Sequence, residues 1–473
     1  MKTRTMKFGG TSVGSAEAIT QVIEIVREAV DQGDRVVIVV SAMAGVTDML
    51  LESVARAVAG DNDGYETLAR QIREKHEGAL TSLIPPGSER EDAYSQLNTL
   101  LDQHLKLCQA IYILGEATPR IMDAIVSFGE RMSSRLVAAA LRAAGSRARA
   151  YDAGQFLITN HNYQNADPLW DETEARIQQD LKPVLEEGVI PVITGFIGAT
   201  PDGQITTLGR GGSDYSASIF AAYTDSDELI IWTDVDGVMT TDPRIDHRAQ
   251  VLPYVSFQEV GELAYYGAKV VHPKTVQPVM DRGIDVFVRN TFNHRHPGTR
   301  IGENGAPSRG VIKAVTSIRS VSLLTVSGRG MLGVPGIAGR TFLATAEAGA
   351  NILMISQSSS EQSFCFTVMD DWAIGVKQAV EEELRTEIVR HHVDGVLIRS
   401  DVVILTVVGA GMSGTPGVAG RVFTVLGDNN VNVLSIAQGA SEVSISFVVA
   451  EADLEKAVVA LHDLVLEKAA VAV

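Results

Sequence analysis

The sequence predicts an α/β protein in which a doubly wound sandwich of parallel strands and helices precedes two copies of a smaller α/β module. Two observations lead to this prediction. Strand-like and helix-like segments alternate over roughly residues 1–300, and the strands are apolar runs without polar alternation, as expected when helices cover both faces of a sheet. Beyond them, one stretch of the chain aligns with a second stretch at a constant offset.

The chain begins with a βαβ unit. Residues 4–8 (RTMKF) are a short strand candidate, and Ser15 is a candidate N-cap for a helix whose apolar residues recur with helical period. The β-branched run Val36–Val40 follows as a second strand. Strand, helix and strand within about 40 residues are typical of a parallel βαβ unit.

Further buried strands are expected at residues 188–196, 228–235 and 284–290, with helical patterns between them. Residues 60–125 look like a helical insertion, in which "PPGSERED" is a polar break. Residues 293–310 are rich in glycine, proline and polar side chains, and we expect them to form a linker.

The segment after this linker contains an internal repeat. "LTVSGRGMLGVPGIAGRTF" (324–342) aligns with "LTVVGAGMSGTPGVAGRVF" (405–423), and "NILMISQSSSE" (351–361) aligns with "NVLSIAQGASE" (432–442). We infer two copies of a module of about 75 residues, each in the ferredoxin-like βαββαβ order. Duplicated packing alone would explain such a repeat. Glycine-rich loops that enter a helix would also leave backbone N–H groups free to hold a small anion, such as the carboxylate of an amino acid.

Composition and charge exclude several classes of function. A formal net charge of −18 argues against a nucleic-acid partner, and it requires the site of any anionic substrate to be locally positive. The two cysteines, Cys108 and Cys365, fit neither a disulfide framework nor a zinc spacing, which favours a reducing cytoplasm. The first residues lack the apolar region of a signal peptide, and no apolar run is long enough for a membrane helix, so we expect no membrane partner.

A first stretch that carries chemistry is "MKFGGTSVGS" (6–15). Lys7 precedes Gly9 and Gly10, whose backbone can approach a ligand closely, and the helix that follows offers free N–H donors. This arrangement suggests a phosphate site, although it is not a Walker loop. An ordinary tight turn with a solvated lysine is the alternative.

A second stretch, "TTLGRGGSDYSA" (206–217), again combines a cation, glycines and a carboxylate at a strand-to-helix junction. Arg210 can form two parallel hydrogen bonds to a carboxylate or a phosphate. Asp214 stands at the start of the next helix, where a carboxylate that simply favours the helix dipole is the alternative.

Three other stretches place polar groups at expected element ends. In "WTDVDGVMTTDPR" (232–244), Asp234 or Asp236 could bind a metal or form an Asx-turn at the carboxyl edge of the sheet. "VSFGERMSSRL" (126–136) places Glu130 at a helix start, either as a dipole partner or as an anion for a substrate ammonium group. Lys269, in "YYGAKVVHPKT", is by itself typical of a solvated surface group.

Together these stretches resemble the aspartokinases of the amino-acid-kinase superfamily. The resemblance includes "VVSAMAGVTDML", "SFGERMSS", "ITGFIGAT" and "GAKVVHPKT", and it continues through both C-terminal modules, which resemble ACT domains. It implies an amino-acid-kinase (carbamate-kinase-like) αβα sandwich over residues 1–305, followed by ferredoxin-like ACT domains over 316–400 and 401–473. Since no dehydrogenase-like domain follows Val473, the expectation is a monofunctional enzyme.

The resemblance implies transfer of the γ-phosphoryl group of ATP to the β-carboxylate of L-aspartate. The product, 4-phospho-L-aspartate, opens the route to lysine, threonine and methionine. A carboxylate with a pKa near about 4 is already ionised at pH 7 and needs no general base, so catalysis should rest on positioning and cations. The implied cofactors are ATP and Mg²⁺, with the ion held largely by phosphate oxygens and water and by no dedicated protein metal site.

The resemblance also assigns roles to single residues. Lys7 would contact the transferring phosphoryl group, and Asp214 would orient Lys7 and the glycine-rich loops. Arg210 would bind the α-carboxylate of aspartate and Glu130 its ammonium group, in a pocket lined by Ser41, Thr47 and Phe196. The expected nucleotide contacts, besides Lys7, are Gly9, Gly10, Ser12, Thr233, Asp234, Met239, Arg244 and Lys269. Met239 departs from the family, whose members usually carry tyrosine there.

The two modules imply regulation by an end-product amino acid and a homodimer or homotetramer assembled through the ACT domains. Gln357 and Gln438 occupy equivalent positions in the two copies, and aspartokinases of the threonine-inhibited class carry glutamine there. Threonine is therefore favoured over lysine as the effector, unless both glutamines simply satisfy backbone groups at a strand end. The alternatives for the whole chain are a kinase of another amino acid or of a nucleotide, and a catalytically inactive amino-acid sensor.

Overall fold

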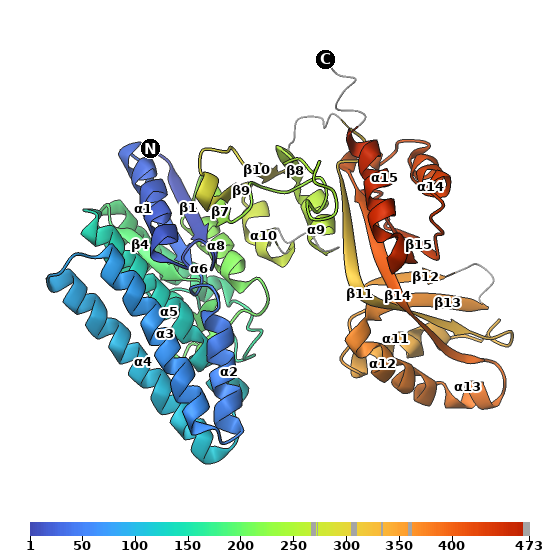
Figure 1. Cartoon of the computed structure of the whole chain (residues 1–473), viewed down its shortest axis with the longest axis horizontal. Coiled ribbons are helices and arrows are strands. Elements are labelled where there is room, and N and C mark those ends of the chain that lie inside the picture. Colours follow the sequence, from blue (N-terminus) through green and yellow to red (C-terminus); the bar gives the residue numbers. More distant parts are fainter. Residues whose placement is uncertain (266–270, 272, 304–309, 333, 358–361, 467–473) are drawn as a thin grey trace. The chain divides into compact units, whose positions relative to one another are not determined.

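The computed structural model describes residues 1–265, 271, 273–303, 310–332, 334–357 and 362–466, which divide into two compact units (Figure 1). The first unit contains residues 1–238, 253–257 and the described part of 271–303. The second contains residues 239–252, 258–265 and the described residues from 310 onward. Within the described residues, no helix combines the length and the apolar character needed to cross a membrane.

The central sheet of the first unit is parallel over most of its width. Its strands are β1 (Thr3–Phe8), β2 (Arg35–Val40), β3 (Ala148–Tyr151), β4 (Ile190–Thr194), β7 (Glu228–Thr233), β8 (Tyr254–Ser256), β9 (Asp285–Asn290) and β10 (Thr299–Gly302). They lie in the order β3–β4–β2–β1–β7–β9–β10–β8, with β10 antiparallel to β9. A separate antiparallel ribbon pairs β5 (Ile197–Ala199) with β6 (Ile205–Thr207).

Some helices of this unit pack against the sheet, and others form a bundle that extends away from it. They are α1 (Ala16–Asp31), α2 (Val46–Val58), α3 (Asn62–Leu83), α4 (Ser88–Leu114), α5 (Pro119–Ala143), α6 (Trp170–Arg176), α7 (Lys182–Glu186), α8 (Gly212–Tyr223) and α10 (Pro273–Met280), with a π-helical turn at Ile177–Leu181. Helix α9 (Phe257–Tyr265) begins in the first unit and continues in the second.

The opening βαβ unit forms as the sequence predicts. The Ser15 hydroxyl accepts a hydrogen bond from the Ala18 N–H at 3.2 Å and so caps α1, and β1 pairs in parallel with β2. Residues 36–40 of β2 are buried, because helices cover both faces of this part of the sheet. These two strands therefore end side by side at one edge of the sheet.

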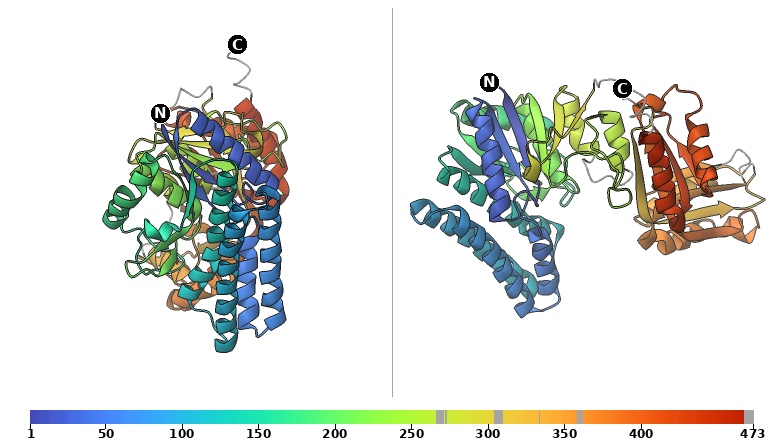
Figure 2. Two further views of the ribbon diagram at one scale, coloured as in Figure 1. Left: turned by 90° about the vertical axis from the view of Figure 1, so that its left-hand side faces the viewer. Right: turned by 45° about the horizontal axis from the view of Figure 1, so that its top comes forward.

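The helical insertion predicted over residues 60–125 contains α3 and α4, which form an elongated bundle with α2 and α5 that extends away from the sheet (Figures 1 and 2). Its apolar side chains belong to the same core as those of the sheet, so the bundle is continuous with the sandwich. Inside it, the buried His104 Nε2 lies 3.0 Å from Ser53 Oγ and 3.3 Å from Cys108 Sγ. Burial lowers the pKa of His104 to about 4, so this cluster is neutral at pH 7.

The prediction of a linker over residues 293–310 is wrong for Thr299–Gly302. These residues form strand β10, which pairs with β9 and β8 inside the sheet. The glycine and proline before β10 belong to the hairpin turn from β9, where Gly298 has φ +77°. Local composition marked the turn correctly but not the short strand that follows it.

The second unit contains one continuous antiparallel sheet. Its strands are β11 (Ala314–Ser327), β12 (Met354–Gln357), β13 (Ser363–Met369), β14 (Gly395–Val408), β15 (Ser435–Gln438) and β16 (Ser444–Ala450), in the order β12–β13–β11–β14–β16–β15. Its helices are α11 (Ile337–Glu347), α12 (Asp370–Glu383), α13 (Arg385–Val389), α14 (Val418–Asp428) and α15 (Leu454–Leu466).

The two long strands β11 and β14 are shared between the two module copies. Residues 323–327 of β11 pair with residues 395–399 of β14 in the sheet of the first copy. Residues 314–318 of β11 pair with residues 404–408 of β14 and complete the sheet of the second copy. The second copy therefore takes its last strand from a segment that precedes the first copy, rather than from its own C-terminal end.

Two stretches before residue 305, residues 239–252 and 258–265, belong to the second unit. Thr240 Oγ1 lies 2.8 Å from His462 Nε2, and His462 Nδ1 lies 2.8 Å from Asp246 Oδ2. The buried Lys313 Nζ lies 2.8 Å from an oxygen of Glu259 in α9. These buried polar contacts attach both stretches to the C-terminal modules.

Candidate functional site

A cavity of about 660 Å³ opens in the first unit at the carboxyl ends of β1, β2 and β4. The residues that line it are Lys7, Gly10, Ser41, Ala42, Met43, Ala44, Gly45, Thr47, Asp48, Glu130, Phe196, Gly209, Arg210, Gly211, Gly212, Ser213 and Asp214. Ligands of parallel α/β sheets bind at this edge. Four loops that are distant in the sequence therefore meet where the sheet topology favours a ligand.

Lys7 and Asp214 form an ion pair inside this cavity. Lys7 Nζ lies 2.6 Å from Asp214 Oδ1, and the two side chains are 11% and 18% exposed. Asp214 stands in the first turn of α8, where the helix dipole also favours a carboxylate. The helix dipole alone does not explain Asp214, because its carboxylate holds the ammonium group of Lys7 in place.

Gly10 permits the close approach of two loops below the cavity. A Cβ atom at Gly10 would lie 3.0 Å from the carbonyl oxygen of Ala42, and the Gly10 carbonyl accepts a hydrogen bond from the Ala44 N–H at 3.0 Å. Position 10 therefore favours glycine because a larger side chain would crowd the loop after β2. Gly9 donates its N–H to the Trp232 carbonyl at 3.1 Å and so joins the loop to the end of β7.

Arg210 lies between two glycines with left-handed backbone. Gly209 and Gly211 both have φ +74°, a conformation that glycine adopts without the strain of a side chain. The Arg210 side chain is exposed and lines the same cavity as Lys7. Phe196 lies against this loop, since a Cβ atom at Gly212 would come within 2.6 Å of its ring.

Glu130 lies in the middle of α5, so the expectation that it begins a helix is wrong. Its residue is 5% exposed, and it lines the cavity. One oxygen, Oε2, is buried without a hydrogen-bond partner among the described residues. Burial raises the pKa of Glu130 to about 8, against the opposing effect of a hydrogen bond from the Ala42 backbone. A buried acid with an unused oxygen at a cavity suits a cationic group of a ligand.

Ser41 and Thr47 are half-buried and line the cavity with Glu130. Ser12 is not among the lining residues of this cavity, and its contact with a nucleotide stays a prediction. Ser12 is fully buried, and its hydroxyl lies 2.7 Å from Thr291 Oγ1 and 3.3 Å from the Trp232 carbonyl. Its hydroxyl therefore ties the loop after β1 to the ends of β7 and β9.

Thr233 and Asp234 end β7, which is a neighbour of β1 in the sheet. The Thr233 hydroxyl donates to Asp234 Oδ1 at 3.2 Å, and both residues lie outside the lining of the cavity. Asp236 Oδ1 accepts hydrogen bonds from the side-chain amides of Asn290 and Asn293 at 2.8 and 3.1 Å. No group of three or more histidine, cysteine or acidic side chains in the described residues could hold a metal ion.

Met239 and Arg244 lie in the second unit, and Lys269 lies outside the described residues. Met239 forms an isolated bridge with Val251. The Arg244 side chain is 82% exposed, and its guanidinium lies 2.7 Å from Asp242, whose pKa it lowers through hydrogen bonds. The contacts of these three residues with a nucleotide therefore stay predictions.

Gln357 and Gln438 stand at the exposed ends of β12 and β15, at matching positions of the two module copies. Asp48, an acidic group in the first turn of α2, lines the cavity although no sequence motif singled it out. The sequence motifs also missed Asp123 of α5, which is buried beside the Arg210 loop. Neither carries a motif of its own, and the spacing of Asp123 within a helical pattern gives no signal.

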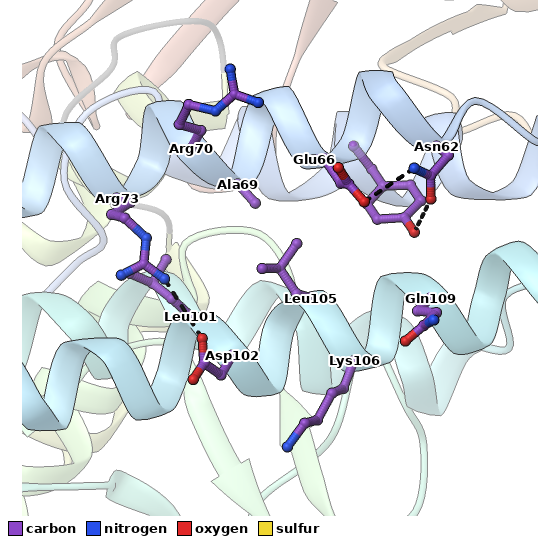
Figure 3. Close-up of a pocket in the computed structure, with 11 residues that line it drawn as sticks. Asn62, Glu66, Ala69, Arg70, Arg73, Leu101, Asp102, Leu105, Lys106 and Gln109 are labelled. Atoms are coloured by element: carbon purple, nitrogen blue, oxygen red, sulfur yellow. Dashed lines mark hydrogen bonds and ion pairs between the residues drawn. The ribbon is translucent and has the colours of Figure 1, made fainter.

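A second cavity, of about 530 Å³, lies between α3 and α4 in the helical bundle (Figure 3). Several of its polar side chains pair with one another. Tyr65 donates its hydroxyl to Asn62 at 2.6 Å, Asn62 donates to Glu66 at 3.1 Å, and Arg73 lies 3.6 Å from Asp102. This cavity is therefore a weaker candidate for a catalytic site than the one that holds Lys7.

Two family models match the chain. The amino acid kinase family model matches residues 2–290, which is more than half of the chain. An ACT domain model matches residues 324–384 and 405–464, one range in each module copy. These matches agree with the sandwich of the first unit and with the duplicated modules of the second.

Known proteins resemble this chain over nearly its whole length. Bifunctional aspartokinase/homoserine dehydrogenase 1, chloroplastic, from Arabidopsis thaliana is 38% identical over 462 residues, which cover 96% of this chain and 50% of that protein. This chain thus spans about half the length of these bifunctional relatives. Aspartokinase 2, chloroplastic, from the same organism is 34% identical over 475 residues, which cover 98% of this chain and 84% of that protein.

A solved structure gives the same result for the fold. The crystal structure of E. coli aspartokinase III in complex with aspartate and ADP has a TM-score of 0.81 and 30% sequence identity, and the match covers 98% of this chain and 100% of that chain. With the family model and the relatives, this likeness shows that the chain belongs to the amino acid kinase family and, within it, to the aspartokinases.

Proposed function

We propose that the chain is an aspartate kinase, which uses ATP to convert L-aspartate to 4-phospho-L-aspartate. The observation that supports this most directly is the cavity itself. Lys7, Arg210 and the buried Glu130 line one hollow at the carboxyl edge of the sheet. Two cations and an acid in one hollow match the charges of an amino acid next to a phosphoryl group. The aspartokinase relatives support the same activity.

The proposed reaction needs no general base. The β-carboxylate of aspartate is ionised at pH 7, because its ordinary pKa is about 4. One of its oxygens forms a bond to the γ-phosphorus of ATP, and the bond from that phosphorus to the β–γ bridging oxygen breaks, so that ADP leaves. Lys7 would stabilise the charge on the transferring group, and Asp214 at 2.6 Å would hold Lys7 in position.

The amino and carboxylate groups of the substrate would be bound by two opposite charges. Arg210 is the proposed partner of the α-carboxylate, since a guanidinium can form two parallel hydrogen bonds to it. Glu130 is the proposed partner of the ammonium group, because its Oε2 is buried and lacks a hydrogen-bond partner in the described part of the chain. Ser41, Thr47 and Phe196 line the space beside them.

The cavity fits the phosphates of a nucleotide at its glycine-rich edge. The close packing at Gly10 and the N-terminus of α8 leave backbone groups where phosphates can approach, next to the Lys7 ammonium. Asp48 and Asp214 in the cavity lining carry the carboxylate oxygens proposed to face a Mg²⁺ ion. A bound Mg²⁺ would neutralise phosphate charge, held mostly by phosphate oxygens and water.

A hydroxamate assay with aspartate and Mg·ATP tests the proposed activity, because hydroxylamine traps an acyl phosphate. We expect the hydroxamate to form with aspartate and not with glutamate. Activity with another amino acid would favour a different kinase of this family. The absence of any product, together with binding of an amino acid to the modules, would favour the inactive sensor.

We further propose that an amino-acid end product inhibits the enzyme through the ACT modules, with threonine favoured over lysine. The matching positions of Gln357 and Gln438 support threonine, whereas one similar crystal structure is of E. coli aspartokinase III with lysine and aspartate. Titration of the activity with each amino acid distinguishes the two. Inhibition by lysine without inhibition by threonine would reverse this choice.

The domain boundaries, a homodimer or homotetramer formed through the ACT modules and a cytoplasmic location stay proposals. The assembly can be measured by light scattering on the purified full chain with and without each amino acid. A monomer at all concentrations and with every effector would contradict the proposed assembly.

A further inference from the structure

Asp123 is a buried carboxylate in α5 that the proposed reaction does not use. It is 1% exposed, and no lysine, arginine or histidine of the described residues forms an ion pair with it. Three donors hold it instead. The Thr207 hydroxyl donates to Oδ1 at 2.8 Å, and the N–H groups of Thr207 and Gln164 donate to Oδ2, each at 3.0 Å. Every one of these donors belongs to a segment next to the Arg210 loop.

Thr207 is the last residue of β6, three positions before Arg210. The next residue, Leu208, donates its N–H to the Phe196 carbonyl at 3.0 Å, so the start of the loop is tied to another wall of the cavity. Gly209 then turns with φ +74°. The position of Thr207 therefore determines where the Arg210 loop enters the cavity.

Gln164 holds the other side of the same loop. A Cβ atom at Gly209 would lie 3.2 Å from the Gln164 carbonyl and 2.7 Å from Asn165 Oδ1, so this segment packs directly on the loop. Gln164 has φ +70°, a left-handed conformation that costs free energy outside glycine and persists where contacts hold it. The hydrogen bond from its N–H to Asp123 is one of these contacts.

Helix α5 carries both Asp123 and Glu130. The two are seven residues apart, which is two helical turns, so they lie on the same face of the helix. Glu130 lines the cavity directly, whereas Asp123 reaches it through Thr207 and Gln164. One rigid helix thus fixes both the acid of the cavity and the entry of the loop that carries its arginine.

We propose that Asp123 is a positioning residue for the amino-acid substrate, which sets the distance between Arg210 and Glu130. This inference rests on the proposed function, in which those two groups bind the α-carboxylate and the ammonium of one α-amino acid. Binding both charges at once requires their separation to match the ligand, and a shift of about 1 Å at either group weakens binding strongly. Neither Arg210 nor Glu130 is among the proposed nucleotide contacts, so a change in their separation should affect the binding of ATP less than that of the amino acid.

The test compares substitutions at Asp123 in steady-state kinetics of the full chain. We expect Asp123→Ala to raise the KM for aspartate about tenfold and to change the KM for ATP less than twofold. Asp123→Asn should remain close to the wild type, because its carbonyl can accept from both backbone N–H groups and its amide can donate to the Thr207 hydroxyl. An unchanged KM for aspartate in Asp123→Ala overturns the proposal.

A matched control separates positioning from a general loss of stability. Asp152 accepts hydrogen bonds from Arg131 and Arg135 of the same helix at 3.2 and 2.5 Å and lies outside the cavity lining. Asp152→Ala should lower the melting temperature and leave both KM values unchanged. If Asp152→Ala raises the KM for aspartate as much as Asp123→Ala does, Asp123 has only a structural role.

A double-mutant cycle tests whether Asp123 acts through Arg210. In an Arg210→Ala background, Asp123→Ala should change the KM for aspartate less than about twofold. Equal effects in both backgrounds would overturn the proposal. If Asp123→Ala does not fold, Thr207→Val removes the hydroxyl bond alone and should raise the KM for aspartate about threefold, and an unchanged value would contradict the inference.

The KM for aspartate of Arg210→Ala distinguishes a failure of the proposed function from a failure of the proposed role of Asp123. If Arg210→Ala leaves the KM for aspartate unchanged, the assignment of Arg210 within the proposed function is wrong. If Arg210→Ala raises that KM and Asp123→Ala does not, the proposed function stands and the role of Asp123 falls.

Discussion

Lys7 is oriented before any substrate arrives, because its ammonium group lies 2.6 Å from Asp214 at the start of α8. We predict that Lys7→Met lowers kcat about 10²- to 10³-fold, since it removes the preorganised ammonium charge proposed to stabilise the transferring phosphoryl group. The KM for aspartate should change little, because Arg210 and Glu130 are the proposed partners of that substrate and both remain in the cavity. Initial rates over a matrix of aspartate and ATP concentrations measure both constants. A rise in the KM for aspartate with kcat preserved would contradict this role.

Glu130 should make aspartate binding dependent on pH. Burial raises the pKa of its carboxyl to about 8 in the free protein, so most molecules carry it protonated at pH 7. An ammonium ligand needs the ionised form, and the apparent affinity scales with the fraction that is ionised. We therefore predict that the KM for aspartate falls several-fold as the pH rises from 7 to 8.5. Glu130→Gln should weaken binding and flatten this profile, whereas a flat profile in the wild type would contradict the prediction.

The sequence motifs indicated several residues that share the cavity, but they did not indicate the charge balance of that cavity. The motifs around Lys7, Arg210 and Asp214 indicated a shared cationic site, and the structure places all three in one cavity. The two cations are, however, accompanied by Asp48 and Asp214 at the same cavity. The two cations and the two aspartates therefore leave the cavity close to neutral. It is less negative than the chain as a whole, whose formal net charge is −18. Contacts between distant loops decide this balance, and no local pattern reports them.

Helix α5 continues through Gly129 and Glu130, although the sequence predicts a helix start at Glu130. Glycine is unfavourable inside a helix, yet Gly129 lies well within α5 (Pro119–Ala143). The reason is packing, since a Cβ atom at Gly129 would lie 2.7 Å from the Cβ of Ala42. Periodic apolar patterns and the Ser15 cap sufficed for the opening βαβ unit, because those signals are local. The pairings of β10 with β8 and of β11 with β14 join segments that are far apart in the chain, and the sequence did not reveal them.

The two helical glycines Gly129 and Gly78 make a matched pair of tests. Gly78, in α3, has nothing within 4 Å of a Cβ position, so Gly78→Ala should stabilise the protein by about 0.5–1 kcal/mol. Gly129→Ala should destabilise it by about 1–3 kcal/mol, because overpacking against Ala42 outweighs the gain in helix propensity. Urea unfolding followed by circular dichroism measures both. Equal stabilisation by the two substitutions would show that the loop after β2 yields to the new methyl group.

The second unit is held together by residues that are far apart in the chain. Glu259 of α9 accepts hydrogen bonds from the buried Lys313 ammonium at 2.8 Å and from the Ala410 N–H at 2.6 Å. We predict that Glu259→Ala destabilises this unit by about 3–5 kcal/mol, because the Lys313 charge loses this partner in a buried place. Hydrogen exchange in β14 and α15 should increase, while exchange in β1 and β2 should not. Loss of protection in all four elements would show that the two units unfold together.

The matching control replaces the pair rather than one partner. Glu259→Leu combined with Lys313→Met removes both charges and keeps apolar volume, so it should recover part of the lost stability. The Ala410 N–H still loses its acceptor, and full recovery is therefore not expected. If the double substitution is no better than Glu259→Ala, the hydrogen bond to Ala410 carries more of the stability than the ion pair.

The exchange of strand halves between β11 and β14 limits how the C-terminal part can be moved to another protein. Residues 314–318 complete the sheet of the second module, and residues 395–399 complete that of the first. A chimeric gene that transplants one repeat by itself would leave an open sheet edge exposed to aggregation. A biosensor built from these modules would therefore need both repeats together, as one segment that begins before residue 314.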